Sequence, residues 1–529
     1  MARSKATVYT CCAVVMLCVV AVIVCIAVLF RHDCPDGTFS MAAVAADSAT
    51  CSKIARDMLQ RGGSAVDGAI AALLCTSIIN PQSMGIGGGS IFTVMDSSGI
   101  VKIINSRETV PGKFKADLLE TCPKTIHVMS GSAWIGVPGE IRGYEQAHKL
   151  YGKLPWASLF QPTIKLAREG FPIPAIQARY IPYADTNKTE PLRKLFSDKD
   201  GKLLKAGDMM KPEDLIRDIQ EAGGTLTVQD LASYRATVTD AWAITLGEYQ
   251  MYFPPPPAGG IILSLILNIM KEYNLSPATL KQKEEKTLAY HHIIEAFKFA
   301  NGLKKHIRDP GFSSEEIAKK FTEDSFAKHI RSLISSEGTH DAQYYNITPY
   351  LESMGTTHVS VLAEDGSAVS VTSTINHIFG SKVYSPRTGI ILNNELVDFC
   401  GKTNNIFPGE QPPSSMAPAV LKSASRTLVI GSTGGSMITT GMASTLMNYL
   451  WFGKSLKEAI AAPAFSINSF NSVKFEPHFD QEVIEALKAL GQKYNDGKIF
   501  YNVVNAVEKK DGCICAVSDA RKMGEAAGY

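Results

Sequence analysis

Two alternating runs past the middle of the chain place hydroxyl-bearing residues at strand ends. Residues 355–376 read Gly-Thr-Thr-His-Val-Ser-Val-Leu-Ala-Glu-Asp-Gly-Ser-Ala-Val-Ser-Val-Thr-Ser-Thr-Ile-Asn. The pattern predicts a β-hairpin, with Thr356 at the start of its first strand and Thr374 near the end of its second. A threonine freed by chain cleavage can use its own α-amine as the base that activates its hydroxyl. Taken alone, such a pattern is more often a purely structural hairpin, so other residues must decide.

Further clusters carry residues suited to binding an amino acid or a developing negative charge. An arginine and a pair of carboxylates provide opposite charges, and two adjacent serines provide hydroxyl donors. A glycine pair before a helix offers backbone N–H groups. Each cluster alone is typical of a solvated face, a loop or a tight turn. The residues are Arg107, Glu395, Asp398, Ser414, Ser415, Gly434 and Gly435.

Length and charge narrow the class of protein. A chain of 529 residues exceeds one small core and predicts one large domain or two intertwined halves. The sequence has 53 Lys and Arg residues against 51 Asp and Glu residues, so it has no basic field. Nucleic acid is therefore not an expected partner. Since no Cys/His cluster has zinc spacing, we expect no metal site.

The N-terminal region predicts a membrane anchor. Residues 9–30 contain no charged side chain, and about 20 helical residues are enough to cross about 30 Å of hydrocarbon. The stretch is longer than the apolar part of a signal peptide, so we favour an uncleaved signal-anchor over a cleaved one. Residues 1–8, with Arg3 and Lys5, would then be cytoplasmic. The protein would be a single-pass type II plasma-membrane protein with an extracellular body.

Glycosylation motifs and cysteines agree with an extracellular body. Cys51 and Cys75 flank a helical stretch and could form a disulfide in an oxidising compartment. Cys513 and Cys515 are expected to be strand residues rather than metal ligands. Three Asn-x-Ser/Thr motifs are candidate glycosylation sites, at Asn187, Asn274 and Asn346.

Helical and strand patterns alternate along the chain, which favours α/β or α+β layers. Residues 51–79 predict two helices broken at a glycine pair, the second apolar nearly all round and therefore buried. The glycine run 85–89 precedes a strand, the wrong order for a dinucleotide or phosphate loop. It lets the backbone approach either a ligand or other protein atoms closely. We also expect helices at 261–270, 290–303, 314–321, 438–450, 455–462 and 480–490, and strands at 91–95, 427–430, 473–476 and 513–517.

Taken in order, these clusters resemble the gamma-glutamyltransferase (glutathione hydrolase) family of N-terminal-nucleophile hydrolases. The resemblance covers nearly the whole chain. It is carried by Gly-Thr-Thr-His-Val-Ser-Val, Ser-Thr-Ile-Asn, Gly-Ile-Ile-Leu-Asn-Asn-Glu, Pro-Ser-Ser-Met, Pro-Pro-Pro-Pro-Ala-Gly-Gly and the ending Ser-Asp-Ala-Arg-Lys to Gly-Tyr.

The resemblance implies an α+β fold, a four-layer αββα sandwich formed jointly by two subunits. A proenzyme would cut itself between Gly355 and Thr356. The products would be a large-subunit ectodomain, 31–355, and a small catalytic subunit, 356–529, which remain together as a heterodimer. Thr356 is a better candidate than Thr357 because the following His-Val-Ser-Val is in family register with it.

The resemblance also implies roles for the clusters. Thr356 would be the nucleophile, oriented by Thr374, with an oxyanion site from the Gly434 and Gly435 amides. A γ-glutamyl group carries an α-carboxylate and an α-ammonium. Arg107, Ser414 and Ser415 would bind the carboxylate, and Glu395, Asp398 and the Asn376 amide oxygen would bind the ammonium. Water or an acceptor amine would resolve the acyl-enzyme, without a metal or organic cofactor.

Substrate preference and two departures from the family complete the expectations. The stretches at 384–389 and 80–84 look most like the member that cleaves glutathione-conjugated leukotrienes, so glutathione conjugates, leukotriene C(4) first, and glutathione itself are expected. Ile378 replaces a tyrosine of glutathione-cleaving relatives, which favours a bulkier, more apolar leaving group. Near Lys211-Pro212-Glu213 a helix and a Phe-Tyr-x-Gly segment are missing. The alternative is therefore an uncleaved, catalytically silent membrane ectodomain that acts as a binding or scaffold protein.

Overall fold

Two antiparallel sheets form the centre of the molecule. The computed structural model describes Met16 and residues 34–123, 131–184, 189–210, 227–349, 355–386, 388–495 and 503–529. One sheet has seven strands in the order β19 (Ala527–Gly528), β1 (Ala43–Ala45), β9 (Thr357–Leu362), β10 (Ala368–Thr374), β2 (Gly89–Met95), β3 (Val101–Asn105) and β6 (Thr237–Asp240). The other has six, in the order β18 (Cys513–Val517), β17 (Val503–Lys510), β14 (Arg426–Thr433), β13 (Ala419–Lys422), β8 (Tyr249–Phe253) and β7 (Trp242–Leu246).

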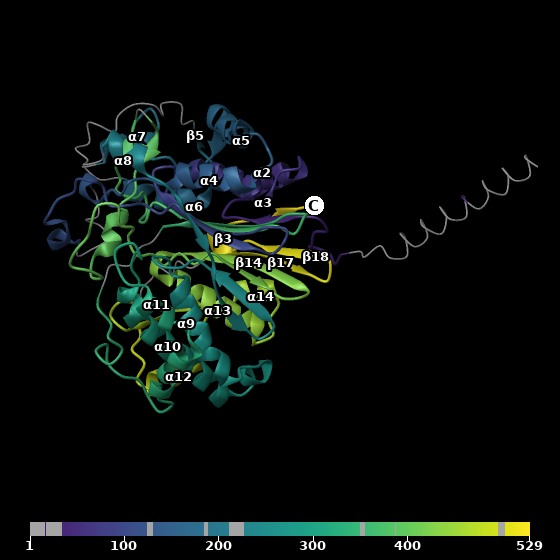
Figure 1. Cartoon of the computed structure of the whole chain (residues 1–529), viewed down its shortest axis with the longest axis vertical. Helices are drawn as coiled ribbons and strands as arrows, with labels where there is room; N and C mark the ends of the chain where they lie inside the picture. The colour runs from purple at the N-terminus through teal and green to yellow at the C-terminus, as the bar shows by residue number, and fades with distance from the viewer. Residues whose placement is uncertain are drawn as a thin grey trace, which may run out of the picture.

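Helices cover the outer face of each sheet (Figure 1). The seven-stranded sheet is covered by α2 (Ala49–Gln60), α3 (Ala65–Ile79), α4 (Glu140–Tyr151) and α5 (Trp156–Glu169). On the side of the six-stranded sheet, α9 (Gly260–Met270), α13 (Ile438–Leu450) and α14 (Leu456–Ala461) contact its strands. The other helices on this side are α10 (Lys283–Leu303), α11 (Glu316–Lys320), α12 (Asp324–Leu333) and α15 (Gln481–Ala489). The layers are therefore αββα, as the family resemblance implied.

Short elements surround this sandwich. They are the helices α6 (Ala175–Tyr180), α7 (Glu190–Leu195) and α8 (Val228–Ser233), and the strand pairs β4 (Phe171–Pro172) with β5 (Met209–Met210), β11 (Tyr384–Ser385) with β12 (Ile390–Ile391), and β15 (Phe465–Ile467) with β16 (Val473–Phe475).

Small and β-branched residues allow the two sheets to pack closely. Their inner faces share an apolar cluster that includes Ala43, Leu362, Val420, Val429 and Val507. Larger apolar residues fill the spaces between each sheet and its helices. Helix α3 is buried along almost its whole length, which explains why its sequence is apolar all round.

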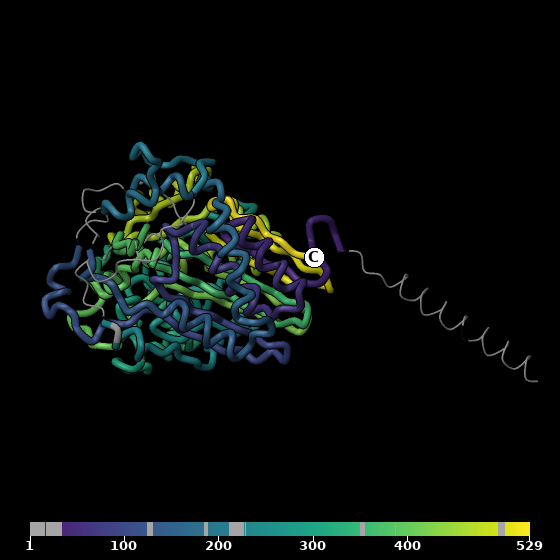
Figure 2. Tube along the Cα trace, turned by 90° about the horizontal axis from the view of Figure 1, so that it is seen from above, coloured from purple at the N-terminus to yellow at the C-terminus, as the bar shows by residue number. Residues whose placement is uncertain are grey.

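The two ends of the described body pair within one sheet. Strand β1 lies between β19 and β9, and the main chain of Tyr529 bonds to that of Ala42. Figure 2 shows this purple N-terminal segment beside the yellow C-terminal end. The sheet that holds Thr356 is thus completed by strands from both sides of residue 355.

Most expected elements are confirmed, and part of the glycine run packs against protein. Helices α3, α9 and α13 and strands β2, β14 and β18 match the predicted ranges to within a few residues. A Cβ on Gly88 would lie 2.0 Å from the Thr374 carbonyl oxygen, and one on Gly87 would lie 2.3 Å from that of Ile391. Protein packing therefore accounts for these two glycines, whereas a Cβ on Gly85 would meet no atom within 4 Å and Gly85 lines a cavity.

Three disulfides are present among the described residues. The predicted Cys51–Cys75 bond is confirmed. Cys34–Cys513 and Cys122–Cys400 were not predicted. Cys513 lies on strand β18 as expected, but reading it only as a strand residue missed its bond to Cys34, 479 residues away in the sequence.

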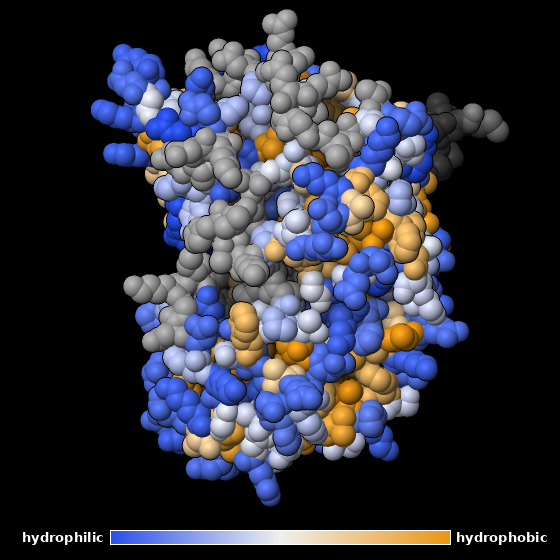
Figure 3. Space-filling model, turned by 90° about the vertical axis from the view of Figure 1, so that its left-hand side faces the viewer, coloured by the Kyte–Doolittle hydropathy of each residue, from blue (hydrophilic) through white to orange (hydrophobic). Residues whose placement is uncertain are grey.

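The face in Figure 3 is largely hydrophilic, with apolar residues in patches between charged ones. No helix among the described residues is long and apolar enough to cross a membrane. Residues 1–8 and the candidate anchor, 9–30, lie outside those residues apart from Met16, as do Asn187 and Lys211-Pro212-Glu213. Asn274 and Asn346 are exposed, so both remain candidate glycosylation sites.

Candidate active site

The hairpin brings Thr356 and Thr374 together. Its register pairs Thr357 with Ser373, so one further step places Thr356 opposite Thr374. The Thr356 hydroxyl donates to the Thr374 Oγ1 at 3.2 Å, and that oxygen also accepts the Asn376 N–H at 2.8 Å. The hydroxyl of Thr374 is thus held by the main chain while it contacts that of Thr356.

Thr356 is held in an unfavourable conformation. Its φ is 96°, a region that β-branched residues rarely adopt, and its side chain is 3% exposed. Its N–H donates to the Ser83 carbonyl at 2.8 Å. Before it, Gly355 leaves no room for a side chain, because a Cβ there would lie 2.3 Å from the Asn376 carbonyl oxygen. The surrounding chain therefore fixes both sides of the Gly355–Thr356 bond.

A buried ion pair holds the carbonyl side of Thr356. Lys522 Nζ donates to the Thr356 carbonyl at 2.5 Å and lies 2.7 Å from Asp47 Oδ2. Thr357 Oγ1 donates to the same Asp47 oxygen at 2.6 Å. Sequence reasoning assigned no role to Asp47 or Lys522. The only available signal was that Lys522 ends the family-like Ser-Asp-Ala-Arg-Lys stretch.

The structure also brings Arg107, Glu395 and Asp398 together. Arg107 follows strand β3, whereas the carboxylates lie three residues apart on one 3-10 turn, Glu395–Phe399. Arg107 Nη1 is 2.6 Å from Glu395 Oε1, and Nη2 is 2.7 Å from Asp398 Oδ2. The guanidinium is fully buried. The turn ends at Cys400, whose disulfide to Cys122 ties it to a distant part of the chain.

Asn376 connects this charged group to the two threonines. Its main-chain N–H bonds to Thr374, and its side-chain amide nitrogen is 3.3 Å from Asp398 Oδ1 and 3.2 Å from the Asn394 carbonyl. The residue has a φ of 74°. The amide nitrogen, and not the amide oxygen expected to bind an ammonium group, is the end that faces Asp398. The nucleophile candidate and the charged group thus share one short connection.

Burial changes the protonation of the carboxyl groups. It raises the pKa of Glu395 to about 7, although the nearby Arg107 charge acts in the opposite direction. Burial, followed by the charge of Glu395, raises the pKa of Glu108 well above its usual value. Burial raises the pKa of Glu140, on α4, to about 8. Glu108 and Glu140 were not singled out from the sequence, because an isolated acidic residue is usually exposed.

The serines and glycines occupy neighbouring segments. Ser414 N donates to the Pro257 carbonyl, and both serines line a small cavity with Lys304 and Lys402. Gly434 and Gly435 have φ values of 115° and 57°, which glycine adopts without strain.

The glycine pair follows strand β14, which packs against the start of the hairpin. A Cβ on Gly431 of this strand would lie 2.1 Å from the His358 ring, two residues after Thr356. The pair then opens a 3-10 turn, Gly435–Met437, that leads into α13. Backbone N–H groups at such a start are suited to a negative oxygen.

An apolar cavity beside helix α3 is a separate feature. It has a volume of about 220 Å³ and is lined by residues of α3, α5 and β12, with Met84 and Met210. None of the candidate catalytic or charged residues lines it. Chemistry is therefore assigned to the hydroxyl and charged groups, not to this cavity. Among the described residues there is also no group of three or more His, Cys, Asp or Glu side chains that could hold a metal ion.

A two-sheet αββα sandwich with a threonine at a strand end defines the class of N-terminal-nucleophile-like folds. Comparisons with known proteins identify the family. The family model "Gamma-glutamyltranspeptidase" matches residues 51–217 and 212–529. The chain is 44% identical to the rat "Glutathione hydrolase 5 proenzyme" over 96% of each chain, and 42% identical to the human protein of that name over 96% of each chain.

A solved structure supports the same fold. The cephalosporin acylase of Bacillus halodurans is 22% identical, with a TM-score of 0.82 over 94% of this chain and 98% of its own. The chain belongs to the gamma-glutamyltranspeptidase family. It is accordingly an enzyme of glutathione metabolism that hydrolyses or transfers γ-glutamyl groups.

Proposed function

We propose that this protein is a self-processing ectoenzyme that uses Thr356 to cleave the γ-glutamyl bond of glutathione and its conjugates. The observation that carries the proposal is the placement of Thr356 beside Thr374, connected through Asn376 to the Arg107–Glu395–Asp398 group. A nucleophile and a pair of opposite charges are what a zwitterionic acyl donor requires.

Self-cleavage would begin at the Gly355 carbonyl. The Thr356 hydroxyl oxygen attacks that carbon, the C–N bond breaks, the hydroxyl proton passes to the Thr356 nitrogen, and the acyl group moves from nitrogen to oxygen. Water then hydrolyses the ester, which leaves a carboxylate on Gly355 and a free α-amine on Thr356. The constrained backbone at residues 355 and 356 supports this step, since it holds the hydroxyl and the bond in one geometry.

Catalysis would use the same hydroxyl. The α-amine takes the Thr356 hydroxyl proton while Oγ1 attacks the γ-carbonyl carbon of the donor, and the amides of Gly434 and Gly435 bind the oxyanion. The proton passes to the leaving amine, and a γ-glutamyl-threonine ester remains. Water resolves this ester in hydrolysis, and an acceptor amine resolves it in transfer. Thr374 would orient the nucleophile throughout.

The donor's charged ends would enter between Arg107 and its two carboxylates. In the structure the Arg107 guanidinium forms ion pairs with Glu395 at 2.6 Å and with Asp398 at 2.7 Å. A zwitterion offers each of them a replacement partner: its carboxylate for Arg107, Ser414 and Ser415, and its ammonium for Glu395, Asp398 and Asn376. Glu395 must be ionised for this exchange, and its raised pKa of about 7 places that ionisation near neutral pH.

For the leaving group we propose a glutathione conjugate with a large apolar arm, such as leukotriene C(4). The support is Ile378, which is partly buried against an apolar cluster with Phe379 and Tyr384. The family resemblance places this position at the edge of the site, where an apolar side chain favours apolar substituents. The similar rat and human proteins are named glutathione hydrolases, which supports glutathione itself as a further donor.

We also propose the division of the chain. Residues 1–8 would be cytoplasmic, 9–30 the membrane anchor, 31–355 the large subunit and 356–529 the small subunit, with the ectodomain outside the plasma membrane. The Cys51–Cys75 disulfide and the exposed Asn274 and Asn346 support an extracellular body. The word "proenzyme" in the names of the similar proteins supports a processed chain.

N-terminal sequencing combined with acyl trapping tests the proposal. The purified protein is reduced and separated, and the smaller chain is sequenced before and after exposure to a γ-glutamyl donor. Threonine at the first cycle, and a γ-glutamyl mass increment on that chain, are expected. A single uncut chain without donor turnover would instead support the silent scaffold.

A further inference from the structure

The five-residue segment 411–415 lies against the side chain of Arg107. The carbonyl of Pro412 accepts a hydrogen bond from Arg107 Nε at 2.7 Å, and that of Pro413 accepts one from Nη2 at 3.2 Å. Proline has no N–H, so this part of the segment presents only acceptors to the guanidinium. The two candidate carboxylate-binding serines follow directly. The segment thus contacts the arginine and carries its expected helpers.

The first residue of the segment, Gln411, holds the main chain of the same arginine. Its amide nitrogen donates to the Arg107 carbonyl at 3.2 Å, and its amide oxygen accepts from Asn105 Nδ2 at 2.8 Å. Asn105 Oδ1 in turn accepts the Arg107 N–H at 2.9 Å. Gln411 N donates to Asp309 Oδ2 at 2.8 Å, which fixes the start of the segment.

Tyr234 provides a second donor to the same carbonyl. Its hydroxyl lies 2.7 Å from the Arg107 carbonyl oxygen. The side chains of Tyr234 and Gln411 are only 6% and 8% exposed, so water does not readily replace either donor. Tyr234 precedes strand β6, whereas Gln411 lies beyond the proposed cleavage point. Both proposed subunits therefore fix one peptide group of Arg107.

We propose that Gln411 and Tyr234 are positioning residues that set the place of the Arg107 guanidinium for the α-carboxylate of the donor. The inference rests on the proposed function of Arg107. Neither side chain touches the donor. They act through the Arg107 backbone, and a displaced guanidinium would bind the carboxylate less well while leaving Thr356 in place.

Two matched donors separate positioning from general damage. One is a γ-glutamyl anilide and the other is the 4-aminobutanoyl anilide, which keeps the amine and the scissile bond but lacks the α-carboxylate. We expect Gln411→Met and Tyr234→Phe each to raise KM for the γ-glutamyl donor about fivefold, the effect of one lost hydrogen bond, with kcat within about twofold. For the donor without the carboxylate, kcat/KM should not change.

The double variant provides a second readout. The side chains of Gln411 and Tyr234 both donate a hydrogen bond to the Arg107 carbonyl oxygen. The effects of Gln411→Met and Tyr234→Phe on KM should therefore not multiply. Two control variants remove an amide and a phenol hydroxyl at positions that do not contact Arg107. Gln161→Met changes an exposed glutamine of α5, and Tyr344→Phe removes a hydroxyl that donates to the Leu333 carbonyl. Both controls should keep the KM of the unchanged protein.

Each outcome has a defined meaning. Equal losses of kcat/KM with the two anilides would overturn the positioning role while the proposed function stands. A fall in kcat at constant KM would do the same. If Gln411→Met fails to fold, Tyr234→Phe decides alone, because it removes a single oxygen. If the unchanged protein releases no aniline from the γ-glutamyl donor, the proposed function falls, and the inference falls with it.

Discussion

Lys522 and Thr356 are joined by a 2.5 Å hydrogen bond from the lysine Nζ to the threonine carbonyl. The lysine is 1% exposed and also pairs with Asp47, which is 2% exposed. A buried charge is tolerated only when it is paired, so Lys522 and Asp47 must stay together in the folded protein. The C-terminal end of the chain, the start of strand β9 and the segment after β1 are therefore fixed relative to one another.

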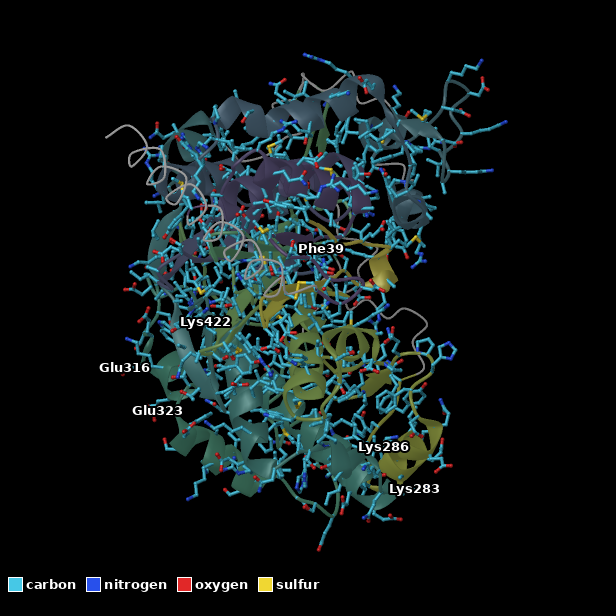
Figure 4. All side chains as sticks on the ribbon, turned by 90° about the vertical axis from the view of Figure 1, so that its right-hand side faces the viewer. Phe39, Lys283, Lys286, Glu316, Glu323 and Lys422 are labelled. Carbon is cyan, nitrogen blue, oxygen red and sulfur yellow. A yellow bond between two sulfur atoms is a disulfide. The ribbon has the colours of Figure 1, made fainter. Side chains whose placement is uncertain are left out.

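Removal of the lysine charge should strongly destabilise the protein. Lys522→Met leaves Asp47 buried without its cation, which costs on the order of 3–5 kcal/mol. Urea unfolding of the purified ectodomain measures the loss. Lys283→Met is the matched control, because Lys283 is exposed on α10 with Glu482 as its partner (Figure 4). Its loss should be below about 1 kcal/mol. Similar losses in both variants would contradict the importance assigned to the buried pair.

Thr356→Ala should block both chain cleavage and donor turnover, because the variant lacks the hydroxyl that both reactions use. A denaturing gel run after reduction should show one chain, and aniline release should be absent. Thr357→Ser keeps the neighbouring hydroxyl that donates to Asp47 and should still give two chains. Two chains from Thr356→Ala would rule out this threonine as the nucleophile.

Arg107→Lys should raise KM far more than it lowers kcat. Lysine keeps the charge but cannot present two parallel N–H groups to a carboxylate or reach all four present partners. Loss of one charge-assisted hydrogen bond weakens donor binding by about 10- to 100-fold. Steady-state kinetics with the γ-glutamyl anilide measure this change. An unchanged KM would remove Arg107 from the donor site.

Glu140 should make the protein less stable as the pH rises. Its folded pKa of about 8 lies above the ordinary value of 4.5, so the folded state holds a proton that the unfolded state has lost. Stability from this group is complete below about pH 4.5 and declines toward pH 8, by at most about 1.4 kcal/mol per pH unit. Glu140→Gln should flatten this decline in urea unfolding at pH 5 and pH 8. Parallel pH profiles for both proteins would count against a buried neutral Glu140.

Local patterns in the sequence predicted the fold better than the contacts of the site. The hairpin, α3 and α13 follow from periodicity and from turn residues a few positions apart, so their sequence contains the necessary information. The contacts of Lys522 with Asp47 and of Gln411 with Arg107 join residues that are 475 and 304 positions apart. Such contacts depend on how whole layers pack, which no local pattern specifies.

Resemblance to a family filled part of that gap. It grouped Arg107 with Glu395 and Asp398, and the structure brings these three side chains together. It gave no role to Glu108, Glu140 or Tyr234, because their environment, not their residue type, makes them unusual. A carboxyl group with a raised pKa needs a dry pocket, and the walls of that pocket come from several distant segments.

Two of the disulfides span the Gly355–Thr356 bond: Cys34 is linked to Cys513, and Cys122 to Cys400. A cut at that bond would give two polypeptides that remain joined by two disulfide bonds. Without a reductant such a molecule would migrate as one species and would not lose its catalytic half by dilution. Outside the cell, where disulfides persist, cleavage would create a new N-terminus and a new C-terminus, but the two polypeptides would remain one covalent molecule.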